Sequence, residues 1–94
     1  MKQQQVRVGQ VVQSKKGRDH GRYFVIIDVL DPDYVLLVDG KLRRLDKPKK
    51  KKVKHFKVSN HISEEIKCRV ESDSKLTNAL VRKEIEKLIG NEIE

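Results

Sequence analysis

Two apolar segments separated by a tight polar turn constrain most strongly how this chain folds. Residues 23–30 are rich in β-branched and aromatic side chains, and residues 34–38 repeat that composition. Asp31, Pro32 and Asp33 stand between them. They favour a turn because proline fixes φ and aspartate side chains bond the local backbone. The pattern predicts two consecutive β-strands joined by a turn.

Shorter segments extend this β-rich pattern. Residues 8–12 carry three valines and are expected to form the first strand. The aspartate-glycine pair that ends at Gly40 predicts a tight hairpin turn, because glycine adopts positive φ without steric cost. Residues 42–45 are then expected to return as a fourth strand, and after Pro48 the apolar-polar alternation of residues 53–58 predicts a fifth. The expected fold class is mainly β, a small barrel of about five strands.

The pattern after residue 58 becomes helical. Ser63 precedes two glutamates and apolar residues at every fourth position, which predicts a capped helix. Thr77 predicts the start of a second short C-terminal helix, and Gly90 its end. One face of this second helix carries an apolar stripe and comprises Leu80, Val81, Glu84, Ile85, Leu88 and Ile89, with Glu84 as its polar member. We therefore expect a barrel over residues 1–58 and a helical C-terminal appendage over residues 59–94.

Aromatic residues and cysteine are scarce, which limits the core and the chemistry. The chain has two Tyr, two Phe, no Trp and one Cys. Phe24 and Phe56 are expected in the core, whereas the hydroxyls of Tyr23 and Tyr34 are expected to reach towards the surface. Cys68 has no second cysteine for an intrachain disulfide or a zinc knuckle, and it is expected to be a passive, half-buried thiol.

Positive charge is concentrated in the first part of the chain. Residues 1–57 contain 16 Lys and Arg against 6 Asp (net +10), whereas residues 58–94 contain 6 Lys and Arg against 8 Asp and Glu (net −2). Such a field attracts polyanions, nucleic acid above all. The sequence contains no apolar run of about 20 residues and no hydrophobic signal region near its start, so we expect a cytoplasmic protein without membrane contact.

A glycine-bracketed basic loop is expected between the first two strands. Its glycines allow a sharp turn and close approach of a ligand, and its basic side chains supply hydrogen-bond donors for phosphates. The residues expected to contact RNA in this loop are Lys15, Lys16, Gly17, Arg18, His20, Gly21 and Arg22. An ordinary solvated hairpin is the alternative interpretation.

A second basic cluster lies between residues 41 and 54. A run of four lysines is typical of a flexible, solvated segment. Its position between expected strands of one small barrel favours function, because the mutual repulsion of the lysines costs stability unless an anion neutralises it. The further candidate RNA contacts are Lys41, Arg43, Arg44, Lys47, Lys49, Lys50, Lys51, Lys52 and Lys54.

The loop that contains Gly17, Arg18 and Gly21 resembles the KOW motif, with Gly21 at the glycine position of that family. Residues 24–30 and 34–38, together with the following basic stretch, resemble the large-subunit ribosomal proteins of the L-fourteen-e type. The resemblance covers residues 6–58. It implies an SH3-like barrel that binds ribosomal RNA, either as a ribosomal protein or as a ribosome-associated factor in translation.

Enzyme, metal and cofactor functions are not expected. Ser14 and Ser63 have no histidine at a suggestive spacing, and the aspartates near Asp31 lack the glycine and glutamate of a calcium loop. The second hypothesis is a protein-interaction module of transcription or RNA-processing machinery, docking through the helix face that carries Leu80, Ile85 and Leu88. General DNA compaction is a third. Recognition of RNA shape and backbone is favoured over base reading, because few aromatics are free to stack.

Overall fold

The protein consists of one antiparallel β-sheet followed by two helices. The computed structural model describes residues 6–15, 17, 18 and 20–93. Its elements are β1 (Gln10–Ser14), β2 (Tyr23–Asp31), β3 (Tyr34–Val38), β4 (Lys49–Lys52), a 3-10 turn (Val53–His55), β5 (Phe56–Ile62), α1 (Glu64–Glu71) and α2 (Asn78–Ile93). This confirms the mainly β fold class with two C-terminal helices. Strands β1 and β5 begin two and three residues later than their sequence patterns predict.

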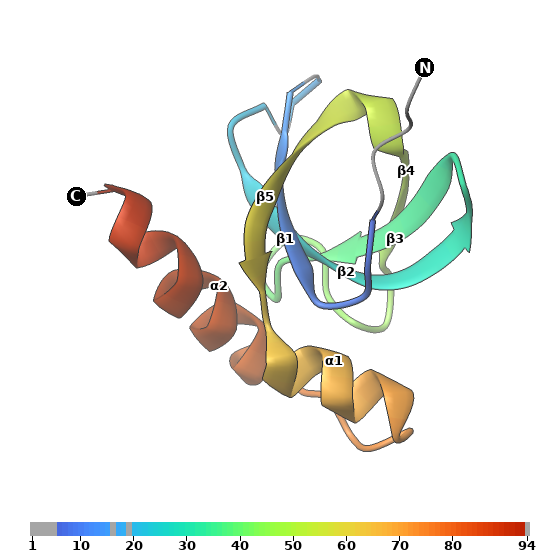
Figure 1. The fold of residues 1–94 in the computed structure, drawn as a ribbon, viewed down its shortest axis with the longest axis vertical. Coiled ribbons are helices and arrows are strands. Elements are labelled where there is room, and N and C mark those ends of the chain that lie inside the picture. Colours follow the sequence, from blue (N-terminus) through green and yellow to red (C-terminus); the bar gives the residue numbers. More distant parts are fainter. Residues whose placement is uncertain (1–5, 16, 19, 94) are drawn as a thin grey trace.

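The sheet has the strand order β4-β3-β2-β1-β5, so the last strand returns to lie beside the first. Figure 1 shows the five strands arranged as a ring, with both helices outside it. This open sheet, curled around its own core, has the architecture expected of an SH3-like barrel. The side chains buried inside the ring are those of Val12, Phe24, Ile26, Val35, Leu37, Val53 and Phe56.

The helices cover part of the outer face of the sheet and create a second core. Its buried members are Val25, Val38, Ile66, Val81 and Ile85. Because β2 and β3 are buried on both faces here, their sequences read as continuous apolar runs and not as a strict alternation. Strand β5 runs on to Ile62, past the boundary expected at residue 58. No helix in the described part of the chain has the length and apolar character needed to span a bilayer.

Both predicted helix starts are confirmed. The Ser63 hydroxyl accepts a hydrogen bond from the Ile66 amide at 3.1 Å, and the Thr77 hydroxyl accepts one from the Leu80 amide at 3.1 Å. The predicted end of the second helix at Gly90 is wrong, because α2 continues to Ile93. A glycine weakens a helix interior by about 1 kcal/mol but ends the helix only where it adopts the left-handed conformation.

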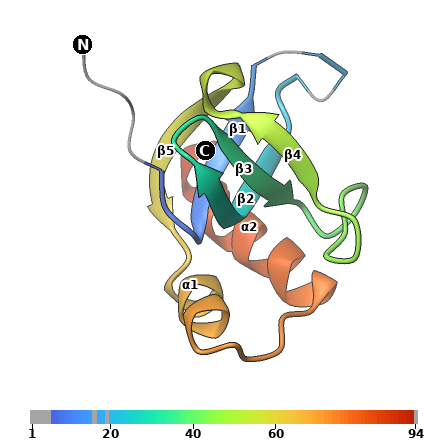
Figure 2. The same ribbon diagram turned by 90° about the vertical axis from the view of Figure 1, so that its right-hand side faces the viewer.

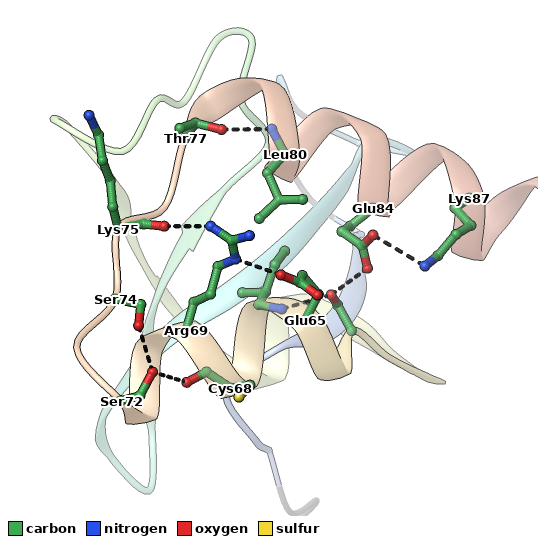
Figure 3. A network of polar contacts seen from close by, with 12 residues as sticks. Glu65, Cys68, Arg69, Ser72, Ser74, Lys75, Thr77, Leu80, Glu84 and Lys87 are labelled. Atoms are coloured by element: carbon green, nitrogen blue, oxygen red, sulfur yellow. Dashed lines mark hydrogen bonds and ion pairs between the residues drawn. The ribbon is translucent and has the colours of Figure 1, made fainter.

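A polar network joins α1, the connection that follows it, and α2 (Figure 3). The Ser63 hydroxyl donates to Glu84 Oε1 at 2.7 Å, and both side chains are buried. Arg69 donates to Glu65 Oε2 at 2.6 Å and to the carbonyl oxygen of Lys75 at 2.9 Å. These contacts hold the two helices as one unit against the sheet.

The thiol of Cys68 is exposed and not half-buried as expected. Ile66 and Val70 on the same helix belong to or pack against the core under the helices. Residues two positions apart on a helix point in different directions, so burying these two side chains turns Cys68 towards solvent.

The fourth strand predicted over residues 42–45 is wrong, because this segment is an irregular loop. The carboxylate oxygen Oδ1 of Asp39 accepts hydrogen bonds from the amides of Lys41 and Arg43, each at 2.9 Å. These amides are therefore bonded locally by an aspartate side chain, which favours a turn over a strand.

The lysine run itself forms the fourth strand. Lys49–Lys52 pair antiparallel with β3 and form an edge of the sheet, where charged residues are tolerated and hinder association with other strands. The alternative interpretation of this run as a flexible, solvated segment therefore does not hold, because its backbone is paired in the sheet. Lys51 is buried, and its ammonium group donates a hydrogen bond to the Ser14 hydroxyl.

Candidate nucleic-acid interface

The predicted basic loop between the first two strands and the loop that carries the first half of the second basic cluster project from the same end of the sheet. In the antiparallel ladder Gln13 pairs with Tyr23, and Val25 pairs with Val38. The loop after β1 (residues 15–22) and the loop after β3 (residues 39–48) therefore leave the sheet side by side. In Figure 2 the loop after β1 lies at the top of the molecule and the loop after β3 at its right-hand edge.

The loop over residues 15–22 is a hairpin built on two glycines. Gly17 and Gly21 have φ of 81° and 87°, as their predicted role in the turn requires. The Gly21 amide donates to the carbonyl oxygen of Ser14 at 2.8 Å, and the Ser14 amide donates to that of Arg22 at 2.9 Å. These bonds continue the β1-β2 ladder into the loop.

The described basic side chains of this hairpin all face solvent. They are those of Lys15, Arg18, His20 and Arg22. The predicted contact Lys16 lies outside the described residues. These solvent-facing basic side chains are accessible to a ligand.

The loop over residues 39–48 is fastened to α2. The Leu45 amide donates to Asn78 Oδ1 at 2.8 Å, and Arg82 Nη1 donates to the carbonyl oxygen of Gly40 at 2.7 Å. A Cβ atom on Gly40 would lie only 2.5 Å from the carbonyl oxygen of Asn78. Asn78 and Arg82 are part of this site although sequence reasoning missed them. Their four-residue spacing on one helix face was the available signal.

The second loop also exposes its cations. Lys41, Arg44 and Lys47 face solvent and Arg43 is partly exposed. Two aspartates belong to the same loop. Asp39 is buried, and its carboxylate accepts hydrogen bonds from backbone amides. Its Oδ2 atom lies 3.9 Å from Nη1 of Arg22 in the neighbouring loop. Asp46 is exposed. The exposed surface of this loop therefore carries a net positive charge.

The lysines of β4 divide between two faces of the sheet. Lys49 and Lys51 pair with Leu37 and Val35, whose side chains belong to the core inside the ring, so they point towards that core. Lys50 and Lys52 point outward. Lys51 was one of the predicted RNA contacts, but its side chain is buried, so we do not count it among the exposed cations.

The outward lysines gather around Tyr34 at the far end of β3. The Nζ atom of Lys50 lies 4.8 Å from the centroid of the Tyr34 ring, and that of Lys52 lies 5.7 Å from it. Tyr34, Lys52, the exposed Lys54 and Asp33 line a hollow of about 270 Å³. Lysine ammonium groups over a tyrosine face form cation-π contacts. From the sequence we expect only the Tyr34 hydroxyl to reach towards the surface, and nothing in it places these lysines around the ring.

A second hollow, of about 170 Å³, lies where the two loops meet α2. Ile85 and Ile89 contribute apolar surface, and Arg22, Lys41 and Arg82 contribute charge. Two of these cations already have partners, because Arg22 lies near Asp39 and Arg82 donates to the Gly40 carbonyl. The carboxylates of Asp39 and Glu86 also line this hollow and offset part of its positive charge.

Comparison with known proteins adds no family to this description: no protein-family model matches the chain, and no curated protein matches it. Within the described residues, no group of three or more His, Cys, Asp or Glu is arranged to hold a metal ion. The site is therefore interpreted from its own geometry, which is that of a cationic surface built on a firmly bonded scaffold.

Proposed function

We propose that this protein binds RNA by its phosphate backbone, using the two basic loops over residues 15–22 and 39–48. The observation that carries the proposal is that the fold brings the exposed cations of both loops to one end of the sheet. Lysine and arginine side chains there bind phosphates through charge and hydrogen bonds.

The energetics of the free protein support the same conclusion. Like charges held close together repel one another. In the two loops, which meet where Arg22 approaches Asp39, the exposed cations outnumber the described carboxylates. A polyanion removes that repulsion and gains the entropy of its released counterions. We expect affinity to fall with salt with a slope of about 0.9 per phosphate contact on a duplex, and less on single strands.

Ribosomal RNA in the cytoplasm is the ligand we propose, as the resemblance to KOW proteins implies. Sedimentation of a cell lysate through sucrose at low and high salt tests this assignment. Co-migration with large ribosomal subunits that is lost at high salt is the expected result. A position at the top of the gradient under both conditions would contradict the ribosomal assignment.

The hypothesis of a docking helix receives less support. Ile85, one of the residues expected to face a protein partner, is buried against the sheet together with Val81. Deleting residues 59–94 is therefore no clean test of function, because it would expose Val25 and Val38 of the sheet and release the loop that Asn78 holds.

A matched pair of triple variants tests the binding surface directly. One replaces Lys15, Arg18 and Arg22 by Ala, and the other replaces three cations of the helical segment, which are Lys67, Lys75 and Lys83. Both lose the same charge. We expect the loop variant to bind a labelled RNA hairpin at least tenfold more weakly in fluorescence anisotropy, about 1.4 kcal/mol, with a salt slope reduced by about two.

The helical-segment variant is expected to bind within about twofold of the parent protein, or about 0.4 kcal/mol. Equal losses in both variants would show that net charge alone governs binding. An unchanged affinity of the loop variant would refute the proposed role of the hairpin.

A further inference from the structure

The uncovered outer face of β3 and β4 contains an aromatic ring surrounded by cations. Lys50 and Lys52 approach the Tyr34 ring to 4.8 and 5.7 Å, and Lys54 lines the adjoining hollow of about 270 Å³. Surfaces that bind single-stranded nucleic acid combine these features, since a ring stacks on a base while cations follow the backbone. Two other aromatic residues, Phe24 and Phe56, are buried in the core and are unavailable for stacking.

The register explains why this ring stays accessible. Tyr34 pairs with Lys52, and Leu36 pairs with Lys50, so these side chains share the outer face. Further along the same face Val38 is fully buried under the helices. Tyr34 lies at the opposite end of β3 and keeps part of its surface exposed.

We propose that Tyr34 stacks on an unpaired base of the bound RNA while Lys50, Lys52 and Lys54 contact the flanking phosphates. This inference rests on the proposed RNA-binding function and adds the class of ligand, an RNA with single-stranded nucleotides. A base in a continuous duplex is stacked between its neighbours and offers no free face to a tyrosine.

The charges around the ring suit such a ligand. The Asp31 carboxylate is occupied by the amides of Asp33 and Tyr34, at 2.8 and 2.9 Å, so it serves the turn. Asp33 is exposed and lines the hollow, where the surrounding lysines outnumber it. Alternate residues of β4 are about 6.8 Å apart, so Lys50 and Lys52 can reach successive phosphates on either side of a base. Their flexible stems let the ammonium groups leave the ring when the base arrives.

The first test uses fluorescence, because the chain contains no Trp. Tyr34→Trp places a single indole at the proposed stacking position. We expect single-stranded oligouridine to quench its fluorescence in a saturable manner, and an RNA duplex with the same number of phosphates to leave it nearly unchanged. Binding of oligouridine in anisotropy without any quenching would overturn the inference.

The second test compares two substitutions of the same residue. Tyr34→Leu is expected to weaken oligouridine binding at least fivefold, the contribution of one stacked base, while duplex binding stays within about twofold. Tyr34→Phe keeps the ring and is expected to bind both RNAs like the parent. Retained duplex binding by Tyr34→Leu also shows that this variant is folded.

The outcomes separate the two proposals. If the parent protein binds neither RNA, the proposed function fails and the stacking inference fails with it. If it binds both, and Tyr34→Leu weakens neither or weakens both equally, RNA binding stands and the stacking inference is overturned. Asp33→Asn removes the carboxylate from the hollow and is expected to strengthen oligouridine binding about twofold, because the repulsion between that carboxylate and the phosphates is lost. A weaker affinity would contradict the proposed position of the phosphates.

Discussion

Replacing Gly40 by alanine tests whether the basic loop over residues 39–48 is built onto α2. Gly40 has φ of 79°, a left-handed conformation that costs a residue with a Cβ atom about 1–2 kcal/mol. The added Cβ would also lie 2.5 Å from the carbonyl oxygen of Asn78 and 2.8 Å from Cγ of Arg82. The first of these atoms is backbone, so either the helix or the loop must shift.

The two effects together give an expected loss of stability for Gly40→Ala. Overpacking of this kind costs about 1–3 kcal/mol, and the reduced freedom of the unfolded chain returns about 0.4–1 kcal/mol. We expect the free energy of unfolding to fall by about 2–4 kcal/mol, a large part of the 5–15 kcal/mol typical of a domain. Urea denaturation followed by circular dichroism measures it.

Gly21→Ala is the matched control. Gly21 has φ of 87°, but no described atom lies within 4 Å of the position of its Cβ. In this variant a residue with a Cβ atom adopts the left-handed conformation, but the Cβ meets no described atom. We therefore expect the free energy of unfolding to fall by only about 1 kcal/mol. If both variants lost the same free energy to within about 0.5 kcal/mol, the close approach of α2 to Gly40 would be refuted.

Two further predictions concern the core and the helix junction. Ser63→Ala removes both the cap of α1 and the hydroxyl that donates to the buried Glu84, so we expect a loss of about 1–3 kcal/mol in urea denaturation. Ser72→Ala removes an exposed hydroxyl and should cost less than about 0.5 kcal/mol, and equal losses would contradict the role of the junction. Phe56→Ala should lower the free energy of unfolding by about 3–5 kcal/mol, because the Phe56 ring is buried inside the sheet. Leu42 has a side chain that is 64% exposed, so the control Leu42→Ala should leave the melting temperature nearly unchanged. A stable Phe56→Ala variant would refute that account of the core.

The sequence alone determined the features that depend on local chemistry. The turn at Pro32 and the caps at Ser63 and Thr77 follow from side chains that bond the nearby backbone, and the structure confirms them. The mainly β class and the burial of Phe56 follow from composition and hydrophobic pattern. The basic composition of the loops is likewise a property of the sequence alone.

Features that depend on distant partners follow from the tertiary structure and not from the local sequence. Residues 42–45 have the pattern of a strand, but Asp39 and Asn78 bind their amides as a loop. Lysines at 49–52 have a low intrinsic preference for strands, yet β3 offers them an edge with which to pair. Lys51 faces the interior, whereas Lys50 faces the Tyr34 ring, because successive side chains of a strand point to opposite faces of the sheet. Which lysine faces which side depends on the register of β4 against β3, and residues distant in the sequence set that register.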